Sequence, residues 1–323
     1  PPRKLSPAAR RWRRAISQSV MDNASPEKAL VLLKTPTNTV VFLATRRILS
    51  TMLKRSSLLD DEIQRFGCRA LASLSKNTAA GAKGVLDAGG PRALVHAMRA
   101  HPRNPEVQSE ACVLVINLTK HNAAAASTVR EYGATQPIVD ALTTHKTVSD
   151  VLVWASAALG FLALHDASGA AAVIAADGHS AVAQVMLGPS RQTMPADADV
   201  LPVIQQWGAA LLSNIARHGT AYASAVAAAG GAKAVCAAMR AQPDDASMQR
   251  DGALTLVNLA KIDAQSAHAV TAAGGAELLV MALRAVIGGD SKEPTWVYVS
   301  GLGHLAKHSA ATAEAVAEAG ALD

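Results

Sequence analysis

Apolar positions recur along the chain with the spacing of amphipathic helices. The clearest stripe repeats every three or four residues and consists of Val107, Ala111, Leu114, Val115 and Leu118. That spacing places the side chains on one face of an α-helix. Asn104 is suited to cap such a helix and Pro105 to occupy its first turn. The pattern therefore predicts a long helix beginning at residue 105.

Two shorter helices accompany this long one. Gly89-Gly90 supplies a tight corner, and Pro91 follows where the first turn of a helix tolerates proline. The apolar pattern then continues to Met98 and stops near residues 101–102. Residues 124–131 form another short helical segment before Gly133. The predicted unit is three helices with a glycine corner before the second.

This unit recurs along the chain. The corner glycines are separated by 44, 45, 52, 44 and 46 residues; they are Gly89, Gly133, Gly178, Gly230, Gly274 and Gly320. A landmark near the end of each third helix has spacings of 44, 44, 53, 44 and 46; it falls at Ser73, Asn117, Phe161, Asn214, Asn258 and His304. Both series lengthen at the same place, which indicates one insertion, assigned to residues 187–202. Internal repeats of this length are typical of solenoids.

Composition supports an all-α chain. Half of the residues are apolar, only 3% are aromatic, and alanine is abundant. Alanine favours helices and lets them approach closely. No apolar run approaches the roughly 18 residues of a membrane span. The sequence predicts an all-α fold without a transmembrane segment.

The net charge of +6 comes from the first twenty residues, which hold six basic side chains and no acid. The remainder is formally neutral, which argues against nucleic-acid binding by the folded part. Residues 1–20 are interpreted as a basic arm, in the simplest case a solvated, mobile terminus. Two alternatives stay open: docking on an anionic surface through Arg10, Arg11, Trp12, Arg13 and Arg14, or the remains of a targeting segment. Residues 21–88 are assigned to capping helices and an atypical first repeat, and residues 89–323 to about five repeats, the last expected to continue beyond the sequence.

Catalytic and metal-binding patterns are missing from the sequence. It contains no P-loop, dinucleotide-binding glycine pattern, nucleophile elbow or Cys/His zinc spacing. Cys68 and Cys112 are 44 residues apart and occupy equivalent positions, as buried apolar residues would. His304 and His308 have helical i, i+4 spacing but no further candidate ligand. We therefore expect no enzyme activity, no metal, no cofactor and no small-molecule substrate.

The glycine corners, together with Ile116-Asn117-Leu118, Ser213-Asn214-Ile215 and Val257-Asn258-Leu259, resemble the armadillo repeat. The resemblance covers about residues 60–323. It implies an armadillo-type right-handed α-solenoid whose third helices line a concave groove for an extended peptide. It also implies that Asn117, Asn214 and Asn258 hold the peptide backbone, since an amide both donates and accepts hydrogen bonds. The ladder is interrupted by Ser73, Phe161 and His304.

If the third helices line a groove, two further sets of side chains lie in it. Trp154, Trp207 and Phe161 are aromatic candidates for anchoring a partner, although packing between repeats explains the tryptophans equally simply. Three residues beyond the landmark, most repeats carry a basic residue: Lys76, Lys120, Arg217, Lys261 and Lys307. These residues could bind acidic or phosphorylated segments, or merely stabilise helix C-termini.

The predicted function is a non-catalytic scaffold or adaptor that binds other proteins in the cytoplasm or cytoskeleton, with an organelle as the alternative location. A second hypothesis is a structural subunit built into an axoneme, a cytoskeletal array or an organellar complex. A third is nuclear import of the importin-alpha type. That family places tryptophan four residues before the groove asparagine, where this chain has Val113, Ala210 and Leu254.

Overall fold

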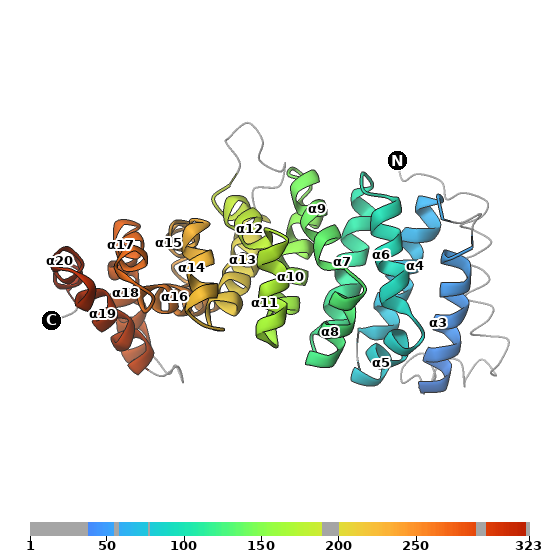
Figure 1. The fold of residues 1–323 in the computed structure, drawn as a ribbon, viewed down its shortest axis with the longest axis horizontal. Coiled ribbons are helices and arrows are strands. Elements are labelled where there is room, and N and C mark those ends of the chain that lie inside the picture. Colours follow the sequence, from blue (N-terminus) through green and yellow to red (C-terminus); the bar gives the residue numbers. More distant parts are fainter. Residues whose placement is uncertain (1–37, 55–57, 77, 189–199, 289–294, 321–323) are drawn as a thin grey trace. The chain divides into compact units, whose positions relative to one another are not determined.

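The computed structural model describes residues 38–54, 58–76, 78–188, 200–288 and 295–320, which form eighteen helices and no strand (Figure 1). Contacts divide the chain into two compact units, unit 1 ending at His145 and unit 2 beginning at Lys146. The predicted basic arm, from Arg10 to Arg14, lies outside the described residues. Among those described, no single helix is long and apolar enough to cross a membrane.

Unit 1 contains the first two third helices, which pack against each other. They are α4 (Asp61–Ser75) and α7 (Pro105–Thr119). The first helices of its repeats are α5 (Ala79–Asp87) and α8 (Ala123–Glu131), and the second helices are α6 (Gly90–Ala100) and α9 (Thr135–Thr144). The additional helix α3 (Asn38–Met52) packs on α4 and α5, as expected for an atypical first repeat.

Unit 2 contains four third helices, each packed on the next. They are α10 (Ser149–Leu164), α13 (Leu201–Ala216), α16 (Ala246–Ala260) and α19 (Thr295–His308). The first helices are α11 (Ala167–Ala175), α14 (Thr220–Ala228), α17 (Ala264–Ala272) and α20 (Ala310–Glu318). The second helices are α12 (Gly178–Met186), α15 (Gly231–Ala241) and α18 (Gly275–Ile287).

Helix starts follow the predicted chemistry. The Asn104 side chain accepts hydrogen bonds from the backbone N–H groups of Glu106 and Val107 at 3.0 and 3.1 Å. Asp60 caps α4 in the same way through the N–H of Ile63. Each cap satisfies donors that the first turn of a helix leaves unpaired. The predicted start of the long helix at residue 105 is confirmed.

The corner before each second helix requires a left-handed backbone. Gly89, Gly133, Gly230 and Gly274 have φ values of 95°, 78°, 79° and 76°. In the third corner, however, the left-handed residue is Asp177, with φ 59°, and Gly178 begins α12. The predicted corner at Gly178 was therefore wrong by one residue. With Asp177 in its place, the corner spacings become 44, 44, 53, 44 and 46, identical to those of the third-helix landmark.

The insertion also needs one correction. Residues 189–199 lie outside the described residues, but α12 ends at Met186 and α13 begins at Leu201. Pro202, predicted to belong to the inserted loop, occupies the first turn of α13. Proline is tolerated there because the N–H it lacks would be unpaired anyway.

Four of the second helices, α3, α6, α12 and α15, are tied to the following third helix by a glutamine that was not predicted from the sequence. Gln108 donates to the carbonyl oxygens of Met98 and His101 at 2.9 and 2.8 Å. Equivalent glutamines bond Met52, Met186 and Met239; they are Gln64, Gln205 and Gln249. Carbonyl groups at a helix C-terminus lack partners within the helix. We call this contact the glutamine clamp; its presence at Met52 identifies α3 as a second helix.

The core consists of alanine and branched aliphatic side chains, and the three cysteines belong to it. Cys68, Cys112 and Cys236 are fully buried and free. Burial raises the pKa of Cys68 to about 12 and that of Cys236 to about 12. A thiol held protonated is a poor nucleophile. The cysteines therefore have a packing role, as predicted.

Candidate functional site

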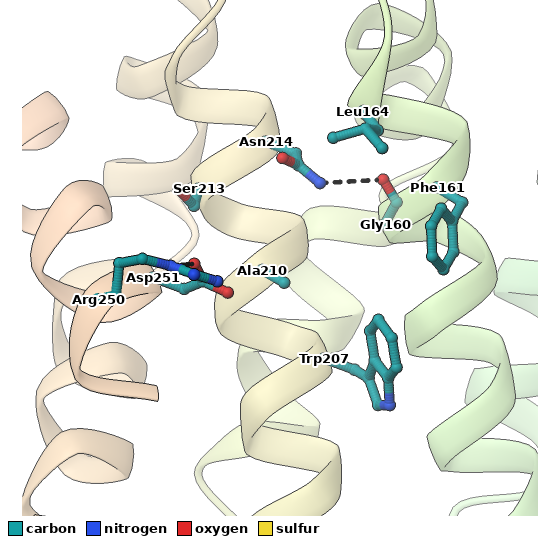
Figure 2. Close-up of a pocket in the computed structure, with 9 residues that line it drawn as sticks. All are labelled: Gly160, Phe161, Leu164, Trp207, Ala210, Ser213, Asn214, Arg250 and Asp251. Carbon is teal, nitrogen blue, oxygen red and sulfur yellow. Dashed lines mark hydrogen bonds and ion pairs between the residues drawn. The ribbon is translucent and has the colours of Figure 1, made fainter. Parts of the chain in front are cut away.

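The third helices α10, α13 and α16 of unit 2 enclose an open cleft of about 220 Å³ (Figure 2). Nine residues line it: Gly160, Phe161, Leu164, Trp207, Ala210, Ser213, Asn214, Arg250 and Asp251. Three of these, Phe161, Trp207 and Asn214, belong to the predicted partner-binding set. The cleft is the place where the structure brings predicted aromatic and amide candidates together.

An aromatic pair forms one wall of the cleft. Phe161 on α10 and Trp207 on α13 are both half-buried, with ring centroids 5.8 Å apart and planes tilted by 48°. Tilted pairs at this distance attract each other through their ring quadrupoles. Figure 2 shows the two rings one above the other along neighbouring helices, with Ala210 facing the space beside them. A small residue at that point leaves room for an apolar side chain against the rings.

Trp154, the third predicted aromatic, does not line the cleft. It lies on α10 two turns before Phe161, and 37% of it is exposed. Packing between repeats therefore does not bury Trp154. Its role in partner binding stays a prediction.

Polar groups close the other sides of the cleft. The Asn214 side-chain N–H donates to the carbonyl oxygen of Gly160 at 3.2 Å, which leaves the amide oxygen directed elsewhere (Figure 2). On α16, Arg250 Nε donates to Asp251 Oδ1 at 3.0 Å. The cleft thus combines an apolar wall with an amide acceptor and an ion pair. Arg250 was not predicted from the sequence, because it belongs to no column of equivalent residues that repeats along the chain.

The three predicted ladder asparagines differ in how they are bound. Asn117 is only 7% exposed, and its N–H donates to the Ala72 carbonyl at 3.2 Å while its oxygen accepts from Lys120. Asn214 makes the equivalent bond to the preceding third helix, and Asn258 is half-buried on α16. Asn117 and Asn214 therefore first serve to join adjacent third helices. Of the three, Asn117 is the least free to bind a peptide.

The basic residues three positions beyond each landmark also differ in how they are bound. Lys120 Nζ donates to the Lys76 carbonyl at 2.7 Å, and Arg217 donates to the carbonyl of Leu164. These cations stabilise the C-terminus of the preceding third helix, where the helix dipole favours positive charge. Burial, followed by the charge of Lys76, lowers the pKa of Lys120. Lys120 and Arg217 therefore stabilise helix C-termini, the alternative to partner binding that the sequence left open.

Lys261 and Lys307 are different. Both are exposed, and neither ammonium group has a hydrogen bond or ion pair with any residue that the structure describes. His304 lies among them: burial, then Lys261, Lys307 and His308, lowers its pKa. Nearby positive charges oppose protonation of a histidine. The ends of α16 and α19 therefore form a cationic cluster, defined here as Lys261, His304, Lys307 and His308.

In unit 1 the third helices α4 and α7 are joined by ion pairs. Arg65 bonds Glu106 and Arg69 bonds Glu110, joining α4 to α7. Hydrogen bonding to Glu110 raises the pKa of Arg69. The pairs sit 41 residues apart in sequence, a spacing close to the repeat length that could have predicted them. Elsewhere in the described ranges, no group of three His, Cys, Asp or Glu side chains is placed to hold a metal.

Comparison with known proteins identifies the fold. No protein-family model and no curated protein sequence matches the chain. Solved structures do match: a designed armadillo repeat protein has a TM-score of 0.65 at 18% identity, covering 80% of this chain and 99% of its own. The chain has the armadillo-type repeat fold.

Two further armadillo structures extend the likeness. A designed armadillo repeat protein in complex with the peptide (KR)4 has a TM-score of 0.62 at 16% identity, covering 80% of this chain and 98% of its own. A structure of computationally designed armadillo repeat proteins for modular peptide recognition has a TM-score of 0.63 at 17% identity. It also covers 80% of this chain and 98% of its own. The armadillo-type solenoid predicted from the glycine corners and Asn-Leu segments is thereby confirmed.

Proposed function

We propose that this chain is a non-catalytic scaffold that binds an extended segment of another protein on the third-helix face of unit 2. The observation that carries the proposal is the Phe161–Trp207 cleft, which offers an apolar wall beside the amide of Asn214. Buried aromatic anchors supply much of the energy of protein interfaces. Peptide binding by designed proteins of the same fold supports the proposal.

The cationic cluster favours a partner with acidic or phosphorylated residues. Lys261 and Lys307 make no ion pair within the described part of the chain, although Asp263 interacts with the charge of His308 in the same cluster. Charge complementarity speeds association and selects partners. A lysine- and arginine-rich segment would be repelled. Asp251 is the only acidic residue lining the cleft, and it already bonds Arg250.

Peptide display against the full chain tests the anchor. Selected peptides are expected to contain an apolar or aromatic residue. Trp207→Ala should weaken the binding of these peptides by about 2 kcal/mol, roughly 30-fold. Trp296 is the matched control, because it is 66% exposed on α19 and does not line the cleft. Equal binding by wild type and Trp207→Ala would refute the proposal.

Charge reversal tests the partner class. The double variant Lys261→Glu/Lys307→Glu should weaken the binding of acidic peptides. Its circular dichroism spectrum should stay as in the wild type, because the fold is unchanged. Reversing Lys120 or Arg217 is unsuitable, since these side chains hold helix C-termini. Tight binding of (KR)4 by this chain would contradict the acidic preference and revive the import hypothesis.

A further inference from the structure

A second cavity, of about 410 Å³, lies in unit 1 and shares no residue with the cleft of unit 2. It is formed by one face of α6 and by the residue that ends α8. The lining consists of Arg92, Val95, His96, Arg99, Ala100 and Tyr132. No acidic side chain lines it, so its lining is cationic and aromatic.

The other repeats serve as an internal comparison for Tyr132. Tyr132 is the C-cap of α8, directly before the corner glycine. In the five other repeats that position is alanine: Ala88, Ala176, Ala229, Ala273 and Ala319. The repeat fold therefore does not require an aromatic side chain here. Tyr132 is 45% exposed and borders the cavity instead of filling the core.

The face of α6 is exceptional in the same repeat. Arg92, His96 and Arg99 share one helix face because they are four and three residues apart. The second helices α9, α12, α15 and α18 do not carry basic or imidazole groups at all three positions. The equivalent residues are Gln136, Asp140 and Thr143 in α9; Ser180, Gln184 and Leu187 in and directly after α12; Lys233, Ala237 and Arg240 in α15; and Glu277, Met281 and Arg284 in α18. Two independent departures from the repeat pattern thus meet in one cavity.

The nitrogen groups of the lining have hydrogen-bonding capacity that the described structure does not use. Arg92 is exposed and makes no hydrogen bond or ion pair with the described part of the chain. His96 Nδ1 is buried and has no partner there either. Arg99 reaches the Gly133 carbonyl only at 3.4 Å, whereas the equivalent Arg240 and Arg284 make their bonds at 2.6 and 3.1 Å. Arg99 is thus the least firmly held arginine of this series.

We propose that this cavity binds a phosphate monoester carried by a phosphorylated side chain of another protein. Guanidinium groups match phosphate oxygens in pairs, and a phenol hydroxyl donates a further hydrogen bond. Arg92 and Arg99 supply the charge, His96 and Tyr132 the additional donors. The Tyr132 ring and Val95 give an apolar wall for the carbon stem of the ligand. The volume exceeds that of a phosphate group alone, as a substituted phosphate requires.

The test is a titration of the full chain with O-phospho-L-serine, followed by NMR of labelled histidine side chains. His96 is expected to shift saturably, while the exposed His121 does not. Arg92→Gln should weaken binding roughly tenfold or more. Because Arg92 has no partner in the described structure, this change leaves folding intact. Lys233→Gln on α15 is the matched control and should bind as wild type.

A second variant separates the site from general surface charge. Tyr132→Ala restores the residue found in the other repeats and keeps every charge, so it should preserve the fold and weaken binding. Unchanged affinity in both Arg92→Gln and Tyr132→Ala would overturn the proposal. A phosphoserine peptide and AMP distinguish the sources of phosphate. Tighter binding of the peptide supports a protein partner, and tighter binding of AMP would overturn that assignment.

Discussion

Single side chains join the helices of this chain through backbone carbonyl groups. Glutamine clamps close α3, α6, α12 and α15. His101 and His145 reach the carbonyls of Leu58 and Pro102 in the preceding repeat, each at 2.9 Å. Helix C-termini carry four carbonyl groups without intrahelical partners. Burying them without donors would be costly, so glutamine side chains of the same repeat supply the donors at the ends of these second helices.

Gln108→Leu should destabilise unit 1. The leucine keeps the volume but leaves the carbonyls of Met98 and His101 without their donor, at a cost of about 1–3 kcal/mol. Denaturant unfolding measures the loss. Gln265→Leu, at an exposed position of α17, is the control and should change stability by less than about 0.5 kcal/mol. Equal effects of the two changes would show that the clamp contributes nothing.

The buried thiols predict a pH dependence. The folded-state pKa of Cys236 is about 12 because of burial, whereas an unfolded cysteine titrates near about 8.5. Its contribution is therefore complete below about pH 8.5 and is lost as pH rises toward 12. By pH 10 the loss is about 2 kcal/mol for this thiol. Denaturation of wild type and Cys236→Ala at pH 7.5 and 10 isolates the contribution of this thiol to the free energy of unfolding. If both proteins lost the same free energy between the two pH values, the raised pKa of Cys236 would be contradicted.

At the scale of elements, neighbouring third helices carry different chemistry. In unit 1, α4 and α7 are joined by two ion pairs. Between α10 and α13 the aromatic pair leaves a cleft, and at the ends of α16 and α19 the lysines are unpaired. The repeat fixes where a side chain lies, and its chemistry decides whether that position is structural or open to a partner.

The cationic cluster makes a measurable prediction. Lys307→Gln removes one of the charges that oppose protonation of His304, so the pKa of His304 should rise toward its ordinary value. Lys307→Arg keeps the charge and should leave that pKa where it is in the wild type. NMR titration of the imidazole follows both. If Lys307→Gln had no effect, the four groups would not interact as described.

Much of this arrangement could be predicted from the sequence, and the limits have physical causes. Corner spacing and helix caps depend on local sequence, so they were predicted to within a residue. The one difference is that Asp177, adjacent to the predicted Gly178, takes the left-handed corner, a conformation that aspartate tolerates. Which cations reach a carbonyl depends on packing between repeats. The sequence pattern therefore predicts the same role for Lys120 and Lys261, although of these two only Lys120 donates a hydrogen bond to a backbone carbonyl, that of Lys76.

At the scale of the whole molecule, stability is local because each third helix contacts its immediate neighbours within a unit. Repeat proteins behave approximately as a sum of repeats and nearest-neighbour interfaces. Unit 1 and unit 2 each have their own buried core. A cavity in one core should therefore be felt first within its own unit.

Leu118→Ala and Leu259→Ala test this at the same register of α7 and α16. Both leucines are fully buried, and each change should cost about 2–5 kcal/mol. Hydrogen exchange should accelerate in α4 and α7 for Leu118→Ala, and in α13, α16 and α19 for Leu259→Ala. Uniform acceleration along the whole chain in either variant would contradict local stability.

The clamp between Gln205 and the Met186 carbonyl, at 3.1 Å, is kept although the sequence between α12 and α13 is longer than in neighbouring repeats. The ends of these helices are thus fastened to each other independently of the chain that links them. That makes the linker a natural place to graft a fluorescent reporter or an affinity tag. An insertion there is expected to leave the bond between Gln205 and the Met186 carbonyl, and with it the packing of α12 on α13, in place.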